Sequence, residues 1–380
     1  MRLGIDAREI QDGVYTGIGR PLVNFLHYFS KQDNKDSCVL FSAKEISIDF
    51  GPRISKVVMP EANTFVWDQW LLPQAIKKAG VDLFYSPYYK IPLLKPCRTV
   101  SAILDLMYIA HKPYYKMMSP WAKLYYATFG KLYAYRADKI LTCSQHSKRD
   151  IERIYGVDEG KIEIIPLSVA AIYSTPLDPA RVTAIKQKFN INGRYVLYMG
   201  NFKVHKNIPC LIHAFAAVAS EYPDLSLVLA GPKEHTYAEL VKIIQNKGLT
   251  QRVIFTGKIM ESDGLQYLYQ GAEVFVMPTL YEGFGIPPLE AMASGVPVIS
   301  SRTTSIPEVT GEAGILIDPG NSSEIADAIR KILQDPILKQ DLINKGVIRA
   351  RAYETEKIAK QMYDFFVFCH SRESGNPLQN

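Results

Sequence analysis

The chain has 380 residues, 47% of them hydrophobic, and exceeds the ~250 to 300 residues at which a single core stops growing, so two domains are expected. Its formal charge of +6 is too weak for a duplex DNA binder, and it suits anionic small molecules or an anionic membrane surface. The five cysteines are odd in number and never spaced as CxxC, so neither a disulfide framework nor a zinc site is indicated, and a reducing cytoplasm fits best.

The first half of the chain reads as one open α/β domain, residues 1–173. It starts with MRLGID, which is typical of a strand and not of a signal peptide. A helix follows with Ile18, Leu22, Leu26 and Phe29 on one face, and then come the strand-like runs VDLFYSP, TVSAILDL, KILTCS and KIEIIP. No run of about 18 apolar residues occurs, so no membrane-spanning helix is expected.

The second half repeats strand and helix signals more regularly, over residues 174–357. Two prolines in STPLDPA mark the join, and from Tyr195 apolar runs such as YVLYMG, SLVLAG, VIFTG, VFVMP and VPVIS alternate with helical segments. That alternation predicts a parallel sheet with helices on both faces. Residues 358–370 are expected to form a helix that returns to the first domain, and 371–380 a polar tail. The fold class is therefore α/β, with two doubly wound Rossmann-like domains.

The segment YEGFGIPPLEAMASG places glycines and prolines between two carboxylates. VFVMP ends a buried strand, so residues 282–286 form a loop at its carboxyl end, where open α/β sheets bind ligands. Pro287 and Pro288 lack amide hydrogens and suit the first turn of a helix. We expect free amides at Gly283, Phe284, Gly285 and Ile286, and then at Leu289 and Glu290. Such a helix start favours a phosphate.

The two carboxylates predict what lies on either side of that phosphate. Glu290 is expected in the first helical turn, turned sideways to accept hydrogen bonds from a ribose diol. Glu282 would accept hydroxyl groups on the far side, so the ligand is a nucleotide sugar. In the alternative interpretation, Glu290 only complements the helix dipole and Glu282 is a solvated loop residue.

These residues resemble a known family, the retaining glycosyltransferases of family 4, and in particular bacterial mannosyltransferases of polysaccharide and O-antigen assembly. EGFGIPPLE is similar to the family's E-x7-E signature, and the resemblance continues through TGIGR, MGNFKVHKN, LVLAGP, VIFTGKI, GAEVFVMP and SIPEVTGEAGILIDP. It implies the GT-B fold, in which two Rossmann-like domains face an interdomain cleft. It also implies a cytoplasmic enzyme that transfers a hexose, with retention, from a nucleotide diphosphate sugar such as GDP-mannose to a glycan or lipid-linked acceptor.

The resemblance also implies roles for particular residues. Glu282 and the amides of Phe284 to Ile286 would hold the donor sugar, and Glu290 the ribose. Lys206 would neutralise the diphosphate, and because it follows the strand YVLYMG its ammonium can reach the charge on a leaving group. Further donor contacts would come from Gly17, Gly19, Lys203, His205, Lys258, Ile259, Gly283 and Leu289. Glu282, Lys206 and Asp105 are the predicted catalytic residues.

The chain departs from the family pattern in two places. Relatives usually carry a His-Asp pair where this chain has Leu104 and Asp105. Leu104 is interpreted either as packing against the methyl group of a 6-deoxy sugar or as the mark of a weakened enzyme. Asp105 would orient the acceptor or cap a helix. Relatives also place an arginine in the loop of Lys206, where Lys203 and His205 are the available substitutes.

Residues 112–136 combine basic and aromatic side chains, and no acidic residue occurs between Asp105 and Asp138. Such a segment is typical of a helix at an anionic lipid surface. The alternative, which the pattern slightly favours, is a helical pair whose aromatic side chains pack internally while the lysines face solvent. No recognised nucleic-acid module accompanies the aromatics, so no nucleic-acid partner is expected.

Other functions fit the motifs less well. TGIGRPL has Leu22 where a dinucleotide fingerprint needs its third glycine, which disfavours an NAD enzyme. No DxD triplet occurs, so we expect metal-independent transfer without a cofactor. The alternatives that stay open are a non-catalytic or weakened sugar-nucleotide-binding protein, a transferase that uses a 6-deoxyhexose or UDP-hexose donor, and a GT-B epimerase.

Overall fold

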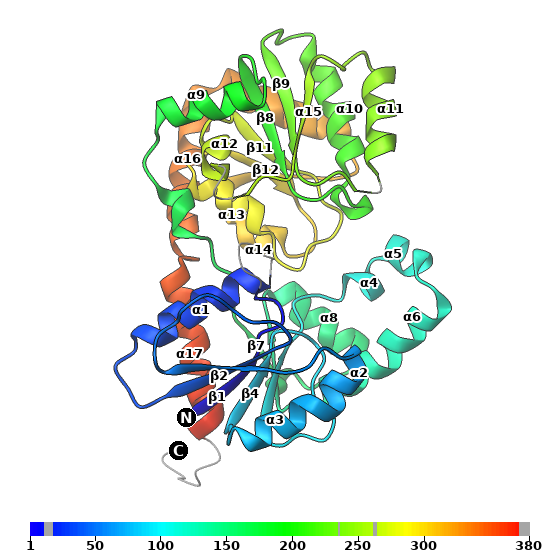
Figure 1. Ribbon diagram of the computed structural model, residues 1–380. Helices are drawn as coiled ribbons and strands as arrows, with labels where there is room; N and C mark the ends of the chain where they lie inside the picture. The colour runs from blue at the N-terminus through cyan, green and yellow to red at the C-terminus, as the bar shows by residue number, and fades with distance from the viewer. Residues whose placement is uncertain (11–17, 235, 261–263, 372–380) are drawn as a thin grey trace. The chain divides into compact units, whose positions relative to one another are not determined.

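The chain divides into two compact units in the computed structural model, which describes residues 1–10, 18–234, 236–260 and 264–371 (Figure 1). The first unit comprises Met1–Ser168 and Thr355–Asn380, and the second comprises Val169–Glu354. The boundaries predicted at 173/174 and 357/358 differ from these limits by a few residues.

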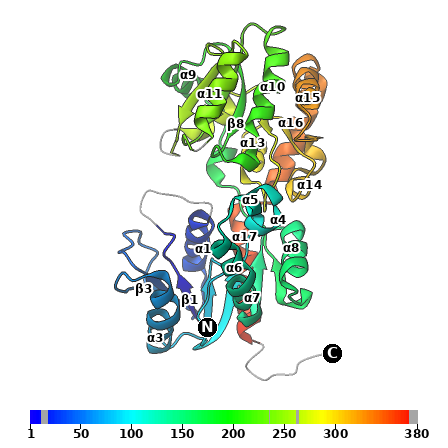
Figure 2. The ribbon, with the colours of Figure 1, turned by 90° about the vertical axis from the view of Figure 1, so that its right-hand side faces the viewer.

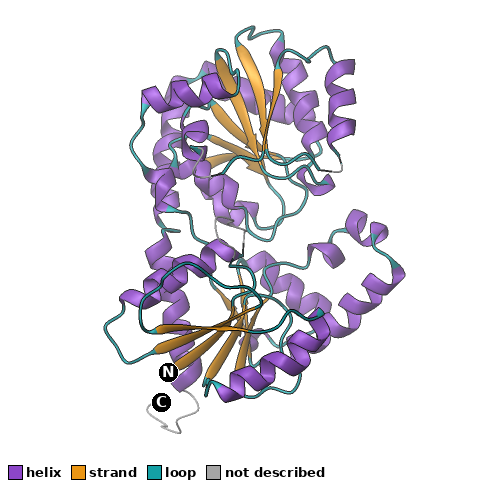
Figure 3. Ribbon diagram, in the orientation of Figure 1, coloured by secondary structure: helices purple, strands orange, loops and turns teal. Residues whose placement is uncertain are grey.

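The first unit contains a parallel sheet of seven strands in the order β3-β2-β1-β4-β5-β6-β7. Helices lie on both faces of this sheet (Figure 3). The strands are β1 (Arg2–Asp6), β2 (Ser37–Ser42), β3 (Ile54–Val58), β4 (Leu83–Ser86), β5 (Arg98–Ala102), β6 (Lys139–Thr142) and β7 (Ile162–Ile164). The helices are α1 (Gly19–Lys31), α2 (Thr64–Val66), α3 (Leu72–Lys78), α4 (Met107–Ala110), α5 (Lys112–Met117), α6 (Pro120–Tyr125), α7 (Lys131–Arg136), α8 (Gln145–Tyr155) and α17 (Thr355–Ser371).

The second unit contains a parallel sheet of six strands in the order β10-β9-β8-β11-β12-β13. The strands are β8 (Arg194–Met199), β9 (Leu225–Ala230), β10 (Val253–Gly257), β11 (Val274–Met277), β12 (Val298–Ser301) and β13 (Gly314–Ile317). The helices are α9 (Pro179–Lys188), α10 (Ile208–Ala219), α11 (Tyr237–Asn246), α12 (Leu265–Gln270), α13 (Ile286–Ala293), α14 (Ile306–Thr310), α15 (Ser322–Gln334) and α16 (Pro336–Arg351). The predicted α/β class with two Rossmann-like domains is confirmed.

Both sheets reverse their strand order once, as doubly wound sheets do. In the first unit β1 pairs with both β2 and β4, so the chain runs outward in one direction to β3 and in the other to β7. In the second unit β8 pairs with both β9 and β11, and the reversal lies between β8 and β11. At such a point the loops after two neighbouring strands diverge and leave room for a ligand.

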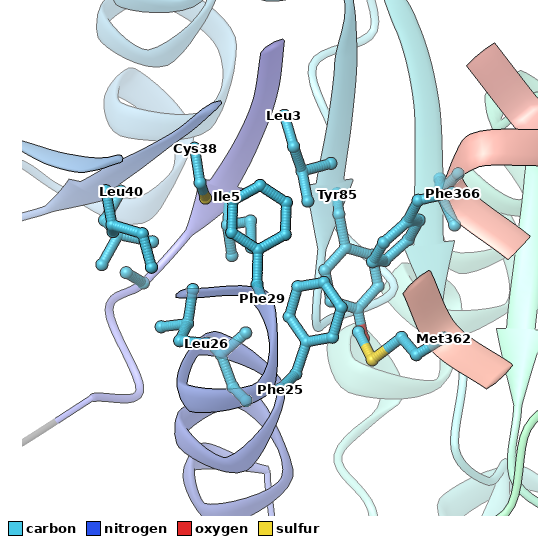
Figure 4. Close-up of a cluster of buried hydrophobic side chains, with 14 of the residues drawn as sticks. Leu3, Ile5, Phe25, Leu26, Phe29, Cys38, Leu40, Tyr85, Met362 and Phe366 are labelled. Atoms are coloured by element: carbon cyan, nitrogen blue, oxygen red, sulfur yellow. The ribbon is translucent and has the colours of Figure 1, made fainter. Parts of the chain in front are cut away.

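The last helix, α17, belongs to the core of the first unit although it is far from it in sequence (Figure 2). Phe366 of α17 lies edge-on to Phe25 of α1, with ring centroids 5.4 Å apart, and 5.1 Å from the ring of Tyr85. Figure 4 shows Met362 and Phe366 pointing into the same cluster as Phe29. The apolar face predicted for α1 therefore packs partly on α17.

In the described ranges, no helix is both long and apolar enough to cross a bilayer.

Candidate functional site

Two loops of the second unit meet at the reversal of its strand order. The loop after β8 carries Lys206, and the loop after its neighbour β11 carries Glu282. Both strands are parallel, so their carboxyl ends share one edge of the sheet, which is the edge where open α/β sheets bind ligands. The structure thus brings together two of the three predicted catalytic residues from positions 76 residues apart.

Lys206 and Glu282 form a salt bridge. Nζ of Lys206 lies 2.5 Å from Oε1 of Glu282, and the same oxygen accepts a hydrogen bond of 2.9 Å from Oγ1 of Thr279. The lysine and glutamate side chains are 11% and 15% exposed. Each therefore keeps some accessible surface, which gives the edge an ammonium for an anionic oxygen beside a carboxylate that can accept hydroxyl groups.

Backbone contacts fix the two loops to each other. The carbonyl oxygen of His205 accepts a hydrogen bond of 2.7 Å from the amide of Leu280 and one of 3.1 Å from Thr279 Oγ1. The hydroxyl of Tyr198, at the end of β8, donates to the carbonyl of Asn201 at 2.9 Å. Burial, and then the charge of Glu282, raises the pKa of this phenol. The spacing of Lys206 and Glu282 is therefore set by the main chain.

The loop that follows β12 supports the Glu282 loop and was not identified from the sequence. Thr304 Oγ1 accepts a hydrogen bond of 3.1 Å from the amide of Glu282, while Ser305 Oγ donates to the carbonyls of Glu282 and Phe284 at 2.9 and 2.8 Å. Thr304 has φ 57°, which is uncommon for a β-branched residue. The polar run SRTTS after a buried strand is the signal that could have found these residues.

Helix α13 begins beside this pair. Its N-cap is Gly285, with φ 113°, and prolines occupy the second and third helical positions. Within the described chain, the amides of Phe284, Gly285 and Ile286 donate no hydrogen bond to a protein group. Successive unpaired donors at a helix start, together with the helix dipole, are the arrangement that favours an anion. They lie in the loop that follows Glu282.

Two details predicted for α13 are wrong. The helix starts at Ile286, so its first turn contains no acidic residue and Glu290 is the fifth helical residue. The amides of Leu289 and Glu290 fall beyond the first three helical positions, so their partners are carbonyl groups inside the helix. The reason is that Gly285 already turns the chain before the prolines. The unpaired amides at this helix start are therefore those before Pro287.

Glu290 is buried within the second unit. Its Oε2 accepts a hydrogen bond of 2.7 Å from the hydroxyl of Tyr269, a fully buried residue of α12. This contact holds the carboxylate in one orientation, and the role of Glu290 in ribose binding stays a prediction.

Lys258 and Ile259 follow β10 at the same carboxyl edge, where Lys258 is exposed and Ile259 is half-buried. Of the two substitutes for the family arginine, Lys203 is half-buried whereas His205 is buried, so the Lys203 side chain is the more accessible.

Replacing Gly285 by alanine tests whether this loop geometry matters. A Cβ at Gly285 would lie 2.6 Å from Cδ1 of Ile306, and φ 113° is unfavourable for alanine. We expect Gly285→Ala to cost about 1 to 3 kcal/mol and to abolish binding of a nucleotide sugar, measured by thermal unfolding and calorimetry. Gly295→Ala is the matched control, because its φ is 72° but its nearest contact is 3.9 Å away. Wild-type ligand affinity in Gly285→Ala would contradict the role of the loop.

The predicted residues of the first unit lie in separate places. Gly17 is outside the described residues, and Gly19 is the first residue of α1. Asp105 follows β5 and is exposed, and its Oδ1 accepts a hydrogen bond of 3.0 Å from the amide of Met107, the first residue of α4. This contact is a local turn before α4, whose N-cap is Leu106 and has no side-chain cap, so both roles predicted for Asp105 stay predictions.

Leu104 lies on the wall of an apolar cavity of about 60 Å³ in the first unit. It packs against the core cluster that includes Ala102 and Leu141, and both of these residues also line the cavity. Among the lining residues, Thr142 has a buried hydroxyl without a hydrogen-bond partner. An imidazole at position 104 would therefore face mostly apolar surroundings.

A buried charged cluster lies at the strand reversal of the first unit and was also missed. The guanidinium of Arg8 contacts Asp6 at 2.5 Å and Asp68 at 2.6 Å, and it lies over the ring of Trp67. Burial raises the pKa of the Asp68 carboxyl although Arg8 opposes the shift. The charges of these groups are paired with one another, so the cluster is a structural network.

Among the described residues, no group of three or more His, Cys, Asp or Glu side chains could hold a metal ion.

Two family models match the chain. The model described as Glycosyltransferase Family 4 covers residues 26–170, and the model described as Glycosyl transferases group 1 covers residues 182–348. The chain is 33% identical over 230 residues to the O-antigen chain mannosyltransferase B of Escherichia coli, a match that covers 59% of each chain. It is 29% identical over 274 residues to the O-antigen chain mannosyltransferase RfbU of Salmonella typhimurium, with 72% of this chain and 71% of that protein covered.

The chain matches only part of several relatives. It is 28% identical over 254 residues to the serotype-specific mannosyltransferase WbdA of Escherichia coli, of which the match covers 30%. Solved structures show the same fold at low identity. Sucrose-phosphate synthase from Thermosynechococcus elongatus has a TM-score of 0.77 at 21% identity, over 98% of this chain and 99% of that one. Anabaena HepE in complex with UDP-glucose has a TM-score of 0.76 at 19% identity, over 96% of this chain and 99% of that one.

Proposed function

The chain belongs to the glycosyltransferases of family 4, and from this premise we propose that it transfers a hexose from a nucleotide diphosphate sugar to a glycan or lipid-linked saccharide, in the cytoplasm and with retention of configuration. The observation that carries the proposal is the edge formed by Lys206, Glu282 and the amides of Phe284 to Ile286. It offers positive charge, unpaired donors and a hydroxyl acceptor within two neighbouring loops.

Mannose is the first candidate for the transferred sugar. The curated relatives named above are mannosyltransferases, and two of them act on O-antigen chains according to their names. GDP-mannose is therefore the first donor to test. The HepE structure contains UDP-glucose, so UDP-hexoses are the second group of donors.

The proposed chemistry needs no covalent intermediate on the protein. The bond between the anomeric carbon and the diphosphate oxygen breaks, and the electron pair leaves with the diphosphate. Lys206 and the amides before Pro287 stabilise the charge that develops there. The acceptor oxygen then bonds to the oxocarbenium-like carbon on the same face and passes its proton to the departing diphosphate. Glu282 orients the sugar through its hydroxyl groups.

Turnover with a donor panel tests this function. The full chain is incubated with GDP-mannose, UDP-glucose and a dTDP-6-deoxyhexose, with and without octyl glycosides as acceptors, and free nucleotide is measured. We expect acceptor-dependent release from one donor, an unchanged anomeric configuration by NMR, and no loss of rate in EDTA. Thermal stabilisation by a donor without turnover would instead favour the non-catalytic sugar-nucleotide-binding protein.

A second candidate is a transferase for 6-deoxyhexoses, which the apolar cavity beside Leu104 favours. A deoxy methyl group suits apolar surroundings that would leave a sugar hydroxyl without a partner. If this donor is used, Leu104→His should lower kcat/KM for the deoxy donor about 10-fold or more relative to the parent hexose, in competition assays. Leu104→Met, which conserves volume, is the matched control. An unchanged or improved rate with the deoxy donor would exclude this candidate.

A further inference from the structure

The helices of residues 107–136 in the first unit expose large apolar side chains to solvent. Figure 1 shows α4, α5 and α6 extending away from the sheet of that unit. Trp121 is 80% exposed and Met117 is 68% exposed, and the other exposed apolar residues here are Tyr108, Tyr115, Leu124, Phe129, Leu132 and Tyr135. Burial of such side chains is normally favourable, so this much exposure marks an interaction surface.

The aromatic side chains of this segment divide into two groups. Tyr126 stacks on Tyr108 and packs against Tyr89, and Tyr133 is buried, so these rings join the helices to the domain. Trp121 and Leu124 lie outside that cluster, on the exposed side of α6. Internal packing therefore accounts for only part of the aromatic content of 112–136.

The exposed surface extends beyond this segment to two neighbouring elements. Gln69 donates a hydrogen bond to the carbonyl of Ile91 and accepts one from the amide of Leu93, whose carbonyl accepts a hydrogen bond from Arg136. The π-helical turn 67–71, the loop 91–95 and α7 are therefore neighbours. The first two add Trp70, which is 68% exposed, and Leu94, which is 81% exposed.

Positive charge is spread among these apolar residues. Between Asp105 and Asp138 the chain has five basic residues and no acidic one. Four of them are exposed, namely Lys112, Lys116, Lys131 and Arg136. Lys123 is half-buried, with its ammonium 4.9 Å from the ring centroid of Tyr115. The cores of protein interfaces are depleted in lysine, whereas lysines among tryptophan and leucine side chains suit the headgroup region of a bilayer.

We propose that this basic aromatic surface, formed by residues 107–136 with Trp70 and Leu94, binds a bilayer that contains anionic phospholipids. Apolar side chains enter the boundary between headgroups and acyl chains, while the basic residues contact lipid phosphates. The contact goes beyond the proposed sugar transfer and does not depend on it. It would also bring the enzyme to lipid-linked acceptors.

Vesicle sedimentation of the full chain tests the proposal. We expect binding to vesicles of phosphatidylcholine with phosphatidylglycerol that is at least 10-fold stronger than to phosphatidylcholine alone and that weakens at high salt. Lys112→Glu with Lys116→Glu should weaken binding more than 10-fold, since each basic residue near the surface contributes about fivefold. Lys242→Glu with Lys247→Glu, on the exposed surface of the second unit, should leave binding unchanged.

Tryptophan fluorescence locates the contact, because all three tryptophans lie in or next to this surface. Brominated anionic vesicles should quench Trp70 and Trp121 but not Trp67, which is 1% exposed, so Trp70→Phe with Trp121→Phe should remove the quenching. Trp121→Ser with Leu124→Ser should abolish vesicle binding, whereas Ile337→Ser with Ile348→Ser, at exposed apolar sites of the second unit, should not.

Circular dichroism and the thermal unfolding temperature serve as the folding check for every variant. Equal binding to neutral and anionic vesicles, or no quenching of Trp70 and Trp121, would overturn the proposal. Self-association that Trp121→Ser abolishes, without binding to anionic vesicles, would also overturn it and assign the surface to a second copy of the chain.

Discussion

Lys206→Met should lower kcat about 10²- to 10³-fold at saturating donor, the size of effect expected when one stabiliser of transition-state charge is removed. The ammonium of Lys206 sits at the carboxyl end of β8, beside the start of the Glu282 loop, where the leaving diphosphate is proposed to lie. Lys206→Arg keeps the charge and should retain more activity than Lys206→Met, although the wider guanidinium does not fit the site of an ammonium ideally. Steady-state kinetics with the preferred donor would measure both.

The salt bridge complicates this variant, because removal of Lys206 leaves the half-buried carboxylate of Glu282 without its cation. Such a loss destabilises a protein by itself. Lys339→Met is the matched control, since Lys339 pairs with Glu273 at 2.5 Å before the amino end of β11, at the opposite edge of the same sheet. We expect both variants to lower the melting temperature and only Lys206→Met to lower kcat. Equal kcat in the two variants would show that Lys206 is structural.

Glu282→Gln should separate sugar recognition from phosphate recognition. The variant keeps the shape of the side chain but loses the charge that accepts hydroxyl hydrogen bonds, and hydrogen bonds to charged groups contribute about 1.5 to 3 kcal/mol. We therefore expect affinity for the nucleotide sugar to fall about 10- to 100-fold. Affinity for the free nucleoside diphosphate should stay constant or rise, because Lys206 is released from its ion pair.

Calorimetric titration of Glu282→Gln with both ligands measures this difference. Thr279→Val is a useful companion, because Thr279 Oγ1 hydrogen-bonds to the same carboxylate oxygen and to the carbonyl of His205, so its loss loosens Glu282 without removing the carboxylate. That variant should show the same pattern with a smaller change. If Glu282→Gln lowers the affinity for both ligands by the same factor, the carboxylate maintains the loop and does not contact the sugar.

The fold could be predicted largely from hydrophobic patterning. The runs around β1, β4 and β8 are continuous and apolar, as expected for strands buried on both faces, and the alternation with helices implied a parallel sheet. β2 and β3 were not identified. β3 lies at the edge of the sheet, so several of its residues are exposed and it has no continuous apolar run. Only its pairing with β2 defines it as a strand. Pairing between distant segments is not visible in local periodicity.

The site was predicted in its residues but not in its contacts. Lys206 and Glu282 were each placed after a strand, yet their ion pair depends on β8 and β11 being neighbours, which the chain order does not reveal. The start of α13 was predicted at Pro287, one residue after its actual start at Ile286, because the prolines gave a stronger signal than the backbone angle of Gly285. Thr304 and Ser305 were missed because their role is to support another loop.

The central claim is that the edge formed by Lys206, Glu282 and the amides before Pro287 binds a nucleotide diphosphate sugar. Titration calorimetry of the wild-type chain and Lys206→Met with GDP-mannose, UDP-glucose and dTDP sugars tests it most directly. The account predicts saturable binding of one of these ligands to the wild type, weakened at least 10-fold in Lys206→Met and unaffected in Lys339→Met. Absence of binding by the whole panel, or equal affinity in Lys206→Met and the wild type, would contradict it.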